Sequence, residues 1–161
     1  MLFVRGKGVW VFVMKNLYDT ATVVEVKERI ARLQPDSERQ WGKMNSAQAV
    51  AHCCASMETA VGMKFPKRVP IGRVLAPLVK SSAFKSPLRR NSPSEKSLIV
   101  TDQRELGRER ERLYGLIDRF AAAGPAGCTT HPHSFFGKLT PEEWATWMYK
   151  HLDHHLGQFG V

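Results

Sequence analysis

Three histidines lie within five residues near the C-terminus, in the stretch YKHLDHHLGQFG at residues 149–160. His151 and His155 are four residues apart, so an α-helix would place their side chains one above the other on one face. His154 would lie roughly a quarter turn away from them. Neutral imidazole nitrogen is a good ligand for zinc, copper, iron and nickel. The spacing of His151 and His155 therefore indicates a divalent metal site.

The helix face that carries these two histidines is otherwise apolar. At helical spacing it also carries Trp144, Trp147, Met148 and Phe159. Buried imidazoles need partners for their polar nitrogens, and two protonated rings would repel each other at close range. A bound cation would meet both requirements. The alternative is a pair of core histidines that hydrogen-bond to carboxylates or water.

A metal site needs at least one further ligand, and His52 is the leading candidate. Periodicity alone argues against it, because His52 lies nearly opposite the apolar stripe of its own helix and would be exposed. Small residues beside it would allow another element to approach closely. The stripe comprises Val50, Cys54, Met57 and Val61, and the small neighbours are Ala49, Ala55 and Ala60. Other candidate ligands are Glu58, His131 and His133, whereas Cys53 and Cys54 are expected to be core residues.

Four helical stretches must position these side chains. Apolar residues at helical spacing predict helices over residues 20–33, 45–62 and 101–124, and a fourth that starts at residue 140 and includes the histidines. The candidate N-caps of the first and third helices are Asp19 or Thr20, and Thr101 or Asp102.

The start signals of the second and fourth helices are the clearest local features of the chain. Asn45 is followed three residues later by Gln48, which is the spacing of a capping box. Thr140 is followed by Pro141 at the first helical position and by Glu143 at the third, which is the stronger of the two signals.

The segment between the second and third helices is strongly basic. Residues 64–98 contain nine basic residues and one acidic residue, in a chain whose formal net charge is +9. Five of the nine prolines fall within residues 63–100, so no long regular helix is expected there, although the stretch GRVLAPLVK could form a turn or two. Such a basic loop could meet phosphate, nucleic acid or an acidic small molecule, or it could simply be solvated.

These elements predict an all-α fold, a four-helix bundle with a long crossover between helices 2 and 3. The length of 161 residues fits one domain, which we assign to residues 14–161 with the basic loop at 63–100. Residues 1–13 have a doubtful status. They are interpreted as an N-terminal extension upstream of Met14, or as a short strand or arm packed on the domain.

Composition argues against several classes of protein. Three cysteines favour a reducing compartment over a secreted disulfide scaffold, so we expect a cytoplasmic protein. No apolar run approaches the roughly 20 residues that span a bilayer, and we expect no membrane partner. Nucleic acid is disfavoured as a partner, because the basic segment has no reader motif and its aromatic residues are limited to Phe65 and Phe84.

Two stretches resemble a known superfamily. HLDHHLGQ resembles the His-x-x-x-His signature, followed by Gly-Gln, on the last helix of the DinB/YfiT-like superfamily. MNSAQAVAHCCASME resembles the second-helix segment that carries its single metal-binding histidine, and HPHSFFGKLTPEEW looks like one branch of it, a domain of unknown function. The resemblance implies a four-helix bundle in up-down-down-up order, with a divalent metal held at one end by His52, His151 and His155.

Three histidines would leave a fourth coordination position open, as in catalytic metal sites. The ion, zinc or nickel in first place and iron or manganese next, would lower the pKa of a bound water or thiol. Two reactions follow, hydrolysis of an ester or amide and transfer of a thiol to an electrophile, and the second is also implied by characterised relatives in the resembling superfamily. His154 is the candidate proton carrier, with Glu58 and His133 as alternatives, and Gln158 is a candidate to orient a ligand histidine.

The expected partner is a small-molecule substrate, either anionic or a low-molecular-weight thiol. Arg89 and Arg90 could hold its anion, although an extended chain would turn at most one of them toward the site. A homodimer formed through bundle faces is also considered. The competing hypothesis is a bundle that binds a metal or small molecule without catalysis.

Overall fold

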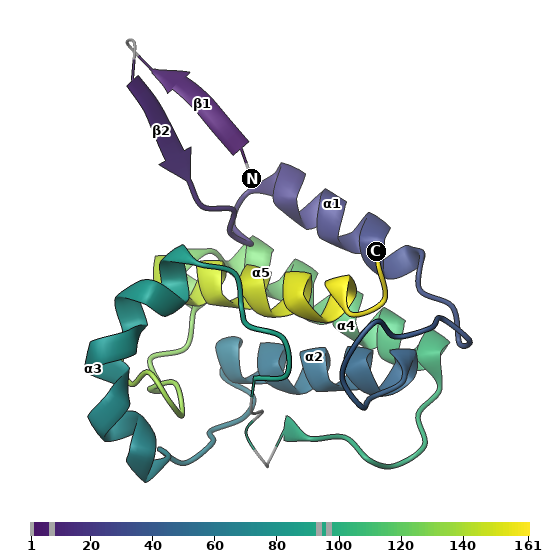
Figure 1. The fold of residues 1–161 in the computed structure, drawn as a ribbon. Coiled ribbons are helices and arrows are strands. Elements are labelled where there is room, and N and C mark those ends of the chain that lie inside the picture. Colours follow the sequence, from purple (N-terminus) through teal and green to yellow (C-terminus); the bar gives the residue numbers. More distant parts are fainter. Residues whose placement is uncertain (1, 7–8, 93–94, 96–97) are drawn as a thin grey trace.

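The computed structural model describes residues 2–6, 9–92, 95 and 98–161. In these residues the chain forms five α-helices, which confirms the prediction of a helical domain: α1 (Thr20–Ala31), α2 (Ser46–Ala60), α3 (Pro70–Lys85), α4 (Leu106–Ala123) and α5 (Pro141–Gly157). A short 3-10 turn (Pro125–Gly127) follows α4. Ahead of α1, β1 (Leu2–Gly6) and β2 (Val9–Val13) pair as an antiparallel hairpin that stands away from the helices (Figure 1). Residues 1, 7 and 8 of the predicted extension lie outside the described residues.

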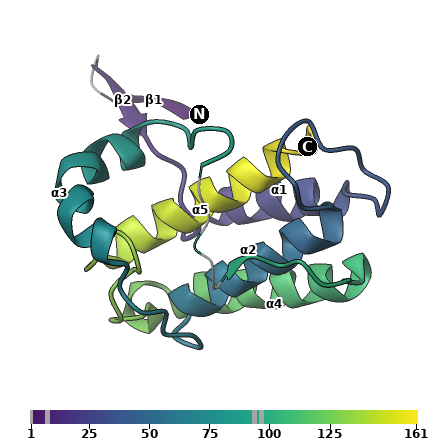
Figure 2. The ribbon, with the colours of Figure 1, turned by 60° about the horizontal axis from the view of Figure 1, so that its bottom comes forward.

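Four of the helices pack around one core. α2 contacts α4 and α5, and α1 contacts the same two helices, so the ring order is α1, α4, α2, α5. α2 and α4 lie side by side in Figure 2. α2 is buried along almost its whole length, because its alanines and other small side chains let neighbouring helices approach on more than one side. The largest fully buried side chains of the core include Trp144, Phe120, Met57, Leu152 and Ile117.

The two predicted capping boxes are confirmed. The Thr140 hydroxyl accepts a hydrogen bond from the Glu143 backbone N–H, and the Glu143 carboxylate accepts one from the Thr140 N–H. Asn45 and Gln48 make the same reciprocal pair at the start of α2. These caps fix where α2 and α5 begin and therefore which residues of each helix face the other.

The predicted N-cap of the third helix is wrong. α4 begins at Leu106 and is capped by Glu105, whose carboxylate accepts hydrogen bonds from two backbone N–H groups of the first turn. Asp102 is unavailable as a cap because its carboxylate pairs with Arg104 at 2.9 Å. Residues 101–105 are therefore not helical.

The prediction that residues 63–100 contain no long helix is also wrong. α3 has 16 residues. Pro70 occupies its first position, where a missing backbone N–H carries no cost, and Pro77 is the one proline within the helix. The number of prolines was a poor guide to helix formation here, because their positions matter more than their number. Pro93 and Lys96 lie outside the described residues. None of the described helices is long and apolar enough to cross a membrane.

Tertiary contacts hold α3 against the end of the domain. Gly72 packs so closely on the loop before α5 that a Cβ atom there would lie 2.6 Å from the Phe135 carbonyl oxygen. At the other end of α3, the buried Lys150 of α5 donates to the carbonyl oxygens of Ala83 and Ser86. A lysine on C-terminal carbonyls stabilises a helix, since those groups have no partner within it.

The loop before α5 is organised by a histidine. His133 Nδ1 accepts hydrogen bonds from the backbone N–H groups of Phe135 and Phe136, at 3.1 and 3.2 Å. Its ring packs on Trp144, with the ring centroids 5.4 Å apart. Burial, assisted by the Arg68 guanidinium, lowers the pKa of His133 to about 4. This histidine therefore serves the loop as a neutral hydrogen-bond acceptor.

Substitution of two helical glycines should have opposite effects. Gly72→Ala should destabilise the protein by about 1–3 kcal/mol, because the new methyl group meets backbone atoms that cannot move aside. Gly115→Ala in α4 should stabilise it by about 0.5–1 kcal/mol, because nothing lies within 4 Å of the added Cβ and alanine favours a helix. Urea unfolding followed by circular dichroism measures both. Equal effects of the two substitutions would contradict the close packing of α3.

His133 should make folding stability depend on pH. Its folded pKa of about 4 lies below the value of about 6.5 for an unfolded histidine, so only the unfolded state gains this proton as the pH falls through that window. The free energy of unfolding should therefore have its full value above pH 6.5 and decrease toward pH 4. The decrease should be about 1.4 kcal/mol for each unit by which the folded and unfolded pKa values differ. In His133→Asn, the Asn oxygen can accept the same backbone hydrogen bonds without titrating. Urea unfolding with a chelator present should give a shallower loss below about pH 6.5 for this variant; the same pH profile in both proteins would contradict the assignment.

Candidate metal centre

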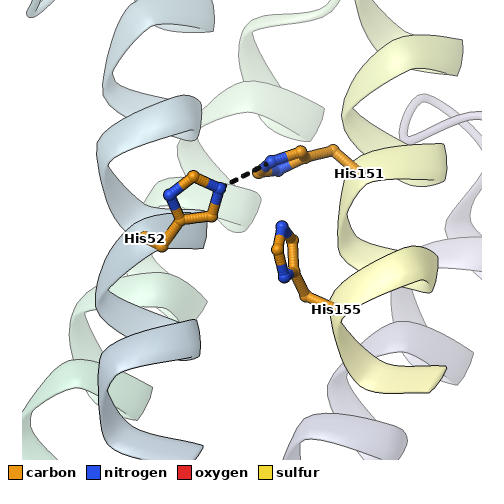
Figure 3. A group of neighbouring side chains, drawn as sticks. All are labelled: His52, His151 and His155. Carbon is orange, nitrogen blue, oxygen red and sulfur yellow. Dashed lines mark hydrogen bonds between the residues drawn. The ribbon is translucent and has the colours of Figure 1, made fainter. Parts of the chain in front are cut away.

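Three imidazoles meet between α2 and α5. His52 projects from α2, and His151 and His155 project from successive turns of α5, as Figure 3 shows. His52 Nε2 lies 3.0 Å from His151 Nε2, and the ring centroids of the three histidines are 4.6–4.9 Å apart. One nitrogen from each ring lies within 4.8 Å of the others.

The expectation that His52 is exposed is wrong, since only 2% of its surface is accessible. A helix with one buried face would expose His52, whereas α2 lies between α4 and α5 and has two buried faces. His155 is also buried, at 7% exposure, and His151 is half-buried. Among the three, His151 is therefore the one with the largest solvent exposure.

Two of the rings have their second nitrogen held by the protein. His52 Nδ1 lies 2.7 Å from the carbonyl oxygen of Leu98, and His155 Nδ1 lies 2.8 Å from Oε1 of the buried Gln158. Carbonyl oxygens only accept, so each Nδ1 carries the proton and each neutral ring presents the Nε2 lone pair. The expected role of Gln158 in orienting a histidine fits this contact.

The cluster is electrically neutral at neutral pH. Burial is the largest cause that lowers the pKa of all three histidines, and it places that of His155 at about 3 with a further contribution from His52. For His151 the three other nearby histidines on α2 and α5 lower the pKa further, beyond the effect of burial. Protons therefore do not compete for the ring nitrogens near pH 7.

The geometry fits a divalent ion. Zinc binds histidine nitrogen at about 2.0–2.1 Å in tetrahedral geometry, which sets two ligand nitrogens about 3.3 Å apart. The His52 and His151 nitrogens are 3.0 Å apart, close to this value, and the nitrogens of all three rings lie within 4.8 Å of one another. Ligand histidines usually donate their outer N–H to a carbonyl or carboxylate, which is what Leu98 and Gln158 provide.

The other candidate ligands lie elsewhere in the described structure. His131 donates to the carbonyl oxygen of Pro66, and the ring of His133 packs on Trp144. Glu58 forms ion pairs with Lys64 and Arg112, which leaves it no role at the three histidines. Cys53 and Cys54 are buried thiols, and burial raises the pKa of both, in agreement with their expected place in the core.

Three further side chains, His154, Trp41 and Arg90, lie beside the cluster. The half-buried His154 contacts the edge of His155, with ring centroids 5.2 Å apart, and it also contacts Trp41 at 6.0 Å. The guanidinium of Arg90 stacks over Trp41 at 4.2 Å. Of the two predicted arginines, Arg90 is therefore the one whose contacts lead to the histidines.

The sequence did not identify three groups that support the histidines or α3, namely the Leu98 carbonyl, Trp41 and Lys150. The Leu98 carbonyl carries no signature because any residue could supply it. Trp41 and the buried Lys150 lie outside every predicted apolar stripe, and only the tertiary structure brings them beside α5 and α3. A tryptophan in a polar stretch just before the Asn45 cap was the one available signal.

Comparison with known proteins gives a family and no activity. The family model described as "Protein of unknown function (DUF1569)" matches residues 15–160, which include α1 to α5 and all three clustered histidines. No curated protein and no solved structure matches the chain. Because the match extends over most of the sequence, the chain belongs to the DUF1569 family.

Proposed function

We propose that this protein is a metal-dependent enzyme that holds one divalent ion on His52, His151 and His155. Zinc or nickel suits three imidazole ligands best, and iron or manganese follows. We also propose that the ring of α1, α4, α2 and α5 is a DinB/YfiT-like four-helix bundle, with residues 63–100 as the crossover between α2 and α4. The resemblance of the histidine stretches supports this assignment.

One observation carries the proposal: three neutral imidazoles converge inside the core, and two of them have their outer nitrogens tied to protein acceptors. A pair of ordinary core histidines needs only hydrogen-bond partners. Here the Nδ1–H groups of His52 and His155 donate to acceptors outside the cluster, so the Nε2 lone pairs of both rings face into it. An arrangement of inward lone pairs suits a cation better than it suits an empty core.

A bound divalent ion would supply Lewis acidity and lower the pKa of a water or thiol at its open position. The chain itself supplies the rest. Leu98 and Gln158 hold the rings of His52 and His155, the buried core excludes water behind them, and His151 leaves one side accessible.

We assign His154 as the proton carrier and Arg90 as the group that recognises an anionic substrate or thiol. His154 contacts a ligand histidine through its ring edge and is half-buried, so a substrate near His151 could reach it. Arg90 is exposed and held in place by Trp41. The two reaction classes are thiol transfer to an electrophile and hydrolysis of an ester or amide.

The competing function is a bundle that binds metal or a small molecule without catalysis. It is favoured by the burial of His52 and His155, since structural metal sites are enclosed. The partial exposure of His151 favours the enzyme.

The protein should bind one zinc ion per chain. His52→Ala and His155→Ala should each weaken binding by more than about 100-fold, because each removes a ligand, and Gln158→Ala should weaken it by about 10–100-fold, because it frees a ligand ring. Competition with a chromophoric chelator measures the affinity. Circular dichroism of each variant confirms that it is folded.

The matched control is His131→Ala, which removes a histidine whose contacts are with Phe65 and Pro66, away from the cluster. Its zinc affinity should equal that of the wild type. A wild-type protein that takes up no zinc, or a His131→Ala variant as impaired as His52→Ala, would contradict the proposed ligand set.

Turnover should depend on the metal. The zinc-loaded protein is tested with a thiol plus an activated aryl halide and, separately, with an activated ester; activity should vanish with a chelator and return with zinc. His154→Gln should lower the rate by about 10²–10⁴-fold while zinc affinity stays unchanged. Activity that survives chelation would exclude a metal enzyme, and zinc binding without turnover of either substrate class would favour the non-catalytic bundle.

A further inference from the structure

The outer face of α3 is apolar, although it faces solvent. Five large side chains on it are exposed, with Val74 at 71% and Leu78 at 78%. We define the α3 stripe as Ile71, Val74, Leu75, Leu78 and Val79, which recur at helical spacing. An exposed apolar patch of this kind on a soluble domain marks a surface that meets another apolar phase or partner.

The stripe faces away from the side by which α3 packs on the domain. Gly72 and Ala76, the buried residues of α3, lie roughly a third of a turn around the helix from the centre of the stripe. α3 also lies at the edge of the molecule, beside the start of α5, in both ribbon views (Figures 1 and 2). The stripe is therefore a protruding helix face, which suits a flat surface better than it suits a helix that needs a groove.

Basic residues lie at both ends of the stripe. Lys67 precedes α3 and Lys85 ends it in line with the stripe, whereas Arg73 lies on the side of the helix away from the stripe; none of the three makes an ion pair with a described residue. Residues 64–92 contain no aspartate or glutamate. Two copies that paired through their stripes would bring these cations together with no acidic residue of the segment to offset them.

We propose that α3 is an interfacial helix that lies on an anionic lipid surface, with the α3 stripe among the acyl chains and the flanking cations at the headgroups. Amphipathic helices with aliphatic residues on one face and lysine or arginine beside it bind in this way, without crossing the bilayer. Anionic lipid attracts each nearby cation by about 1 kcal/mol. This attachment departs from the expectation of no membrane partner, which rested on the lack of an apolar run long enough to span a bilayer, and it does not depend on the metal site.

The test is co-sedimentation of the full-length protein with vesicles. It should partition onto vesicles of phosphatidylcholine with phosphatidylglycerol, bind vesicles of phosphatidylcholine alone much more weakly, and bind less as salt is added. The double variant Val74→Gln/Leu78→Gln should lose about tenfold or more of the partition coefficient. Lys67→Gln/Lys85→Gln should lose about fivefold for each charge removed.

Matched controls change similar side chains elsewhere. Val24→Gln alters a valine of α1 that is 50% exposed, and Arg39→Gln/Arg108→Gln removes two exposed charges outside α3; both should bind as the wild type does. Circular dichroism confirms folding of every variant. Equal binding to both vesicle types, no binding, or undiminished binding by Val74→Gln/Leu78→Gln would overturn the proposal. It would also be overturned by a concentration-dependent dimer that this variant abolishes, because the stripe would then be an interface between two copies.

Discussion

The structure depends on keeping three imidazoles inside an apolar core without protonating them. A ring nitrogen removed from water needs a hydrogen bond or a cation, and a charged ring needs an anion that this core does not provide among the described residues near the cluster. The outward nitrogens of His52 and His155 are satisfied by Leu98 and Gln158. The nitrogens that face one another inside the cluster carry at most one proton. That proton is on His151, at its 3.0 Å contact with His52.

Several contacts elsewhere in the fold position the three histidines. The capping box at Thr140 fixes the start of α5, so that His151 and His155 face α2 rather than solvent. Small side chains on α2 let α4 and α5 approach from two sides, which buries His52. The backbone N–H of Gln40, in the loop before α2, donates to the carbonyl oxygen of Gln158 at 2.7 Å. Gly42 of the same loop leaves room for the Gln158 amide, since a Cβ there would lie 2.5 Å from its Nε2. The loop before α2 thus supports the group that orients His155.

Sequence alone predicted the elements whose signals are local. Helix periodicity and the capping boxes located α1, α2 and α5, and the spacing of His151 and His155 identified the pair, because these features are set by neighbours within a few residues. His52 could not be predicted from its own helix, since its burial follows from packing against a helix about a hundred residues further along the chain. His52 was the leading candidate for a third ligand although periodicity argued against it, and the resemblance to the DinB/YfiT-like superfamily supported it.

The failures have a similar origin. α3 was missed because its stability comes from Gly72 against Phe135 and from Lys150 at its last carbonyls, contacts that no local propensity encodes. The cap of α4 was misplaced because Arg104 engages the carboxylate of Asp102.

The most direct measurement is an anomalous difference map at the zinc absorption edge, from crystals of protein purified without a metal-affinity tag and grown with zinc. We expect one strong peak per chain between α2 and α5, about 2.0–2.1 Å from a nitrogen of each of the three histidines. Zinc bound elsewhere, or these rings hydrogen-bonded to one another around ordered water with no peak between them, would contradict it.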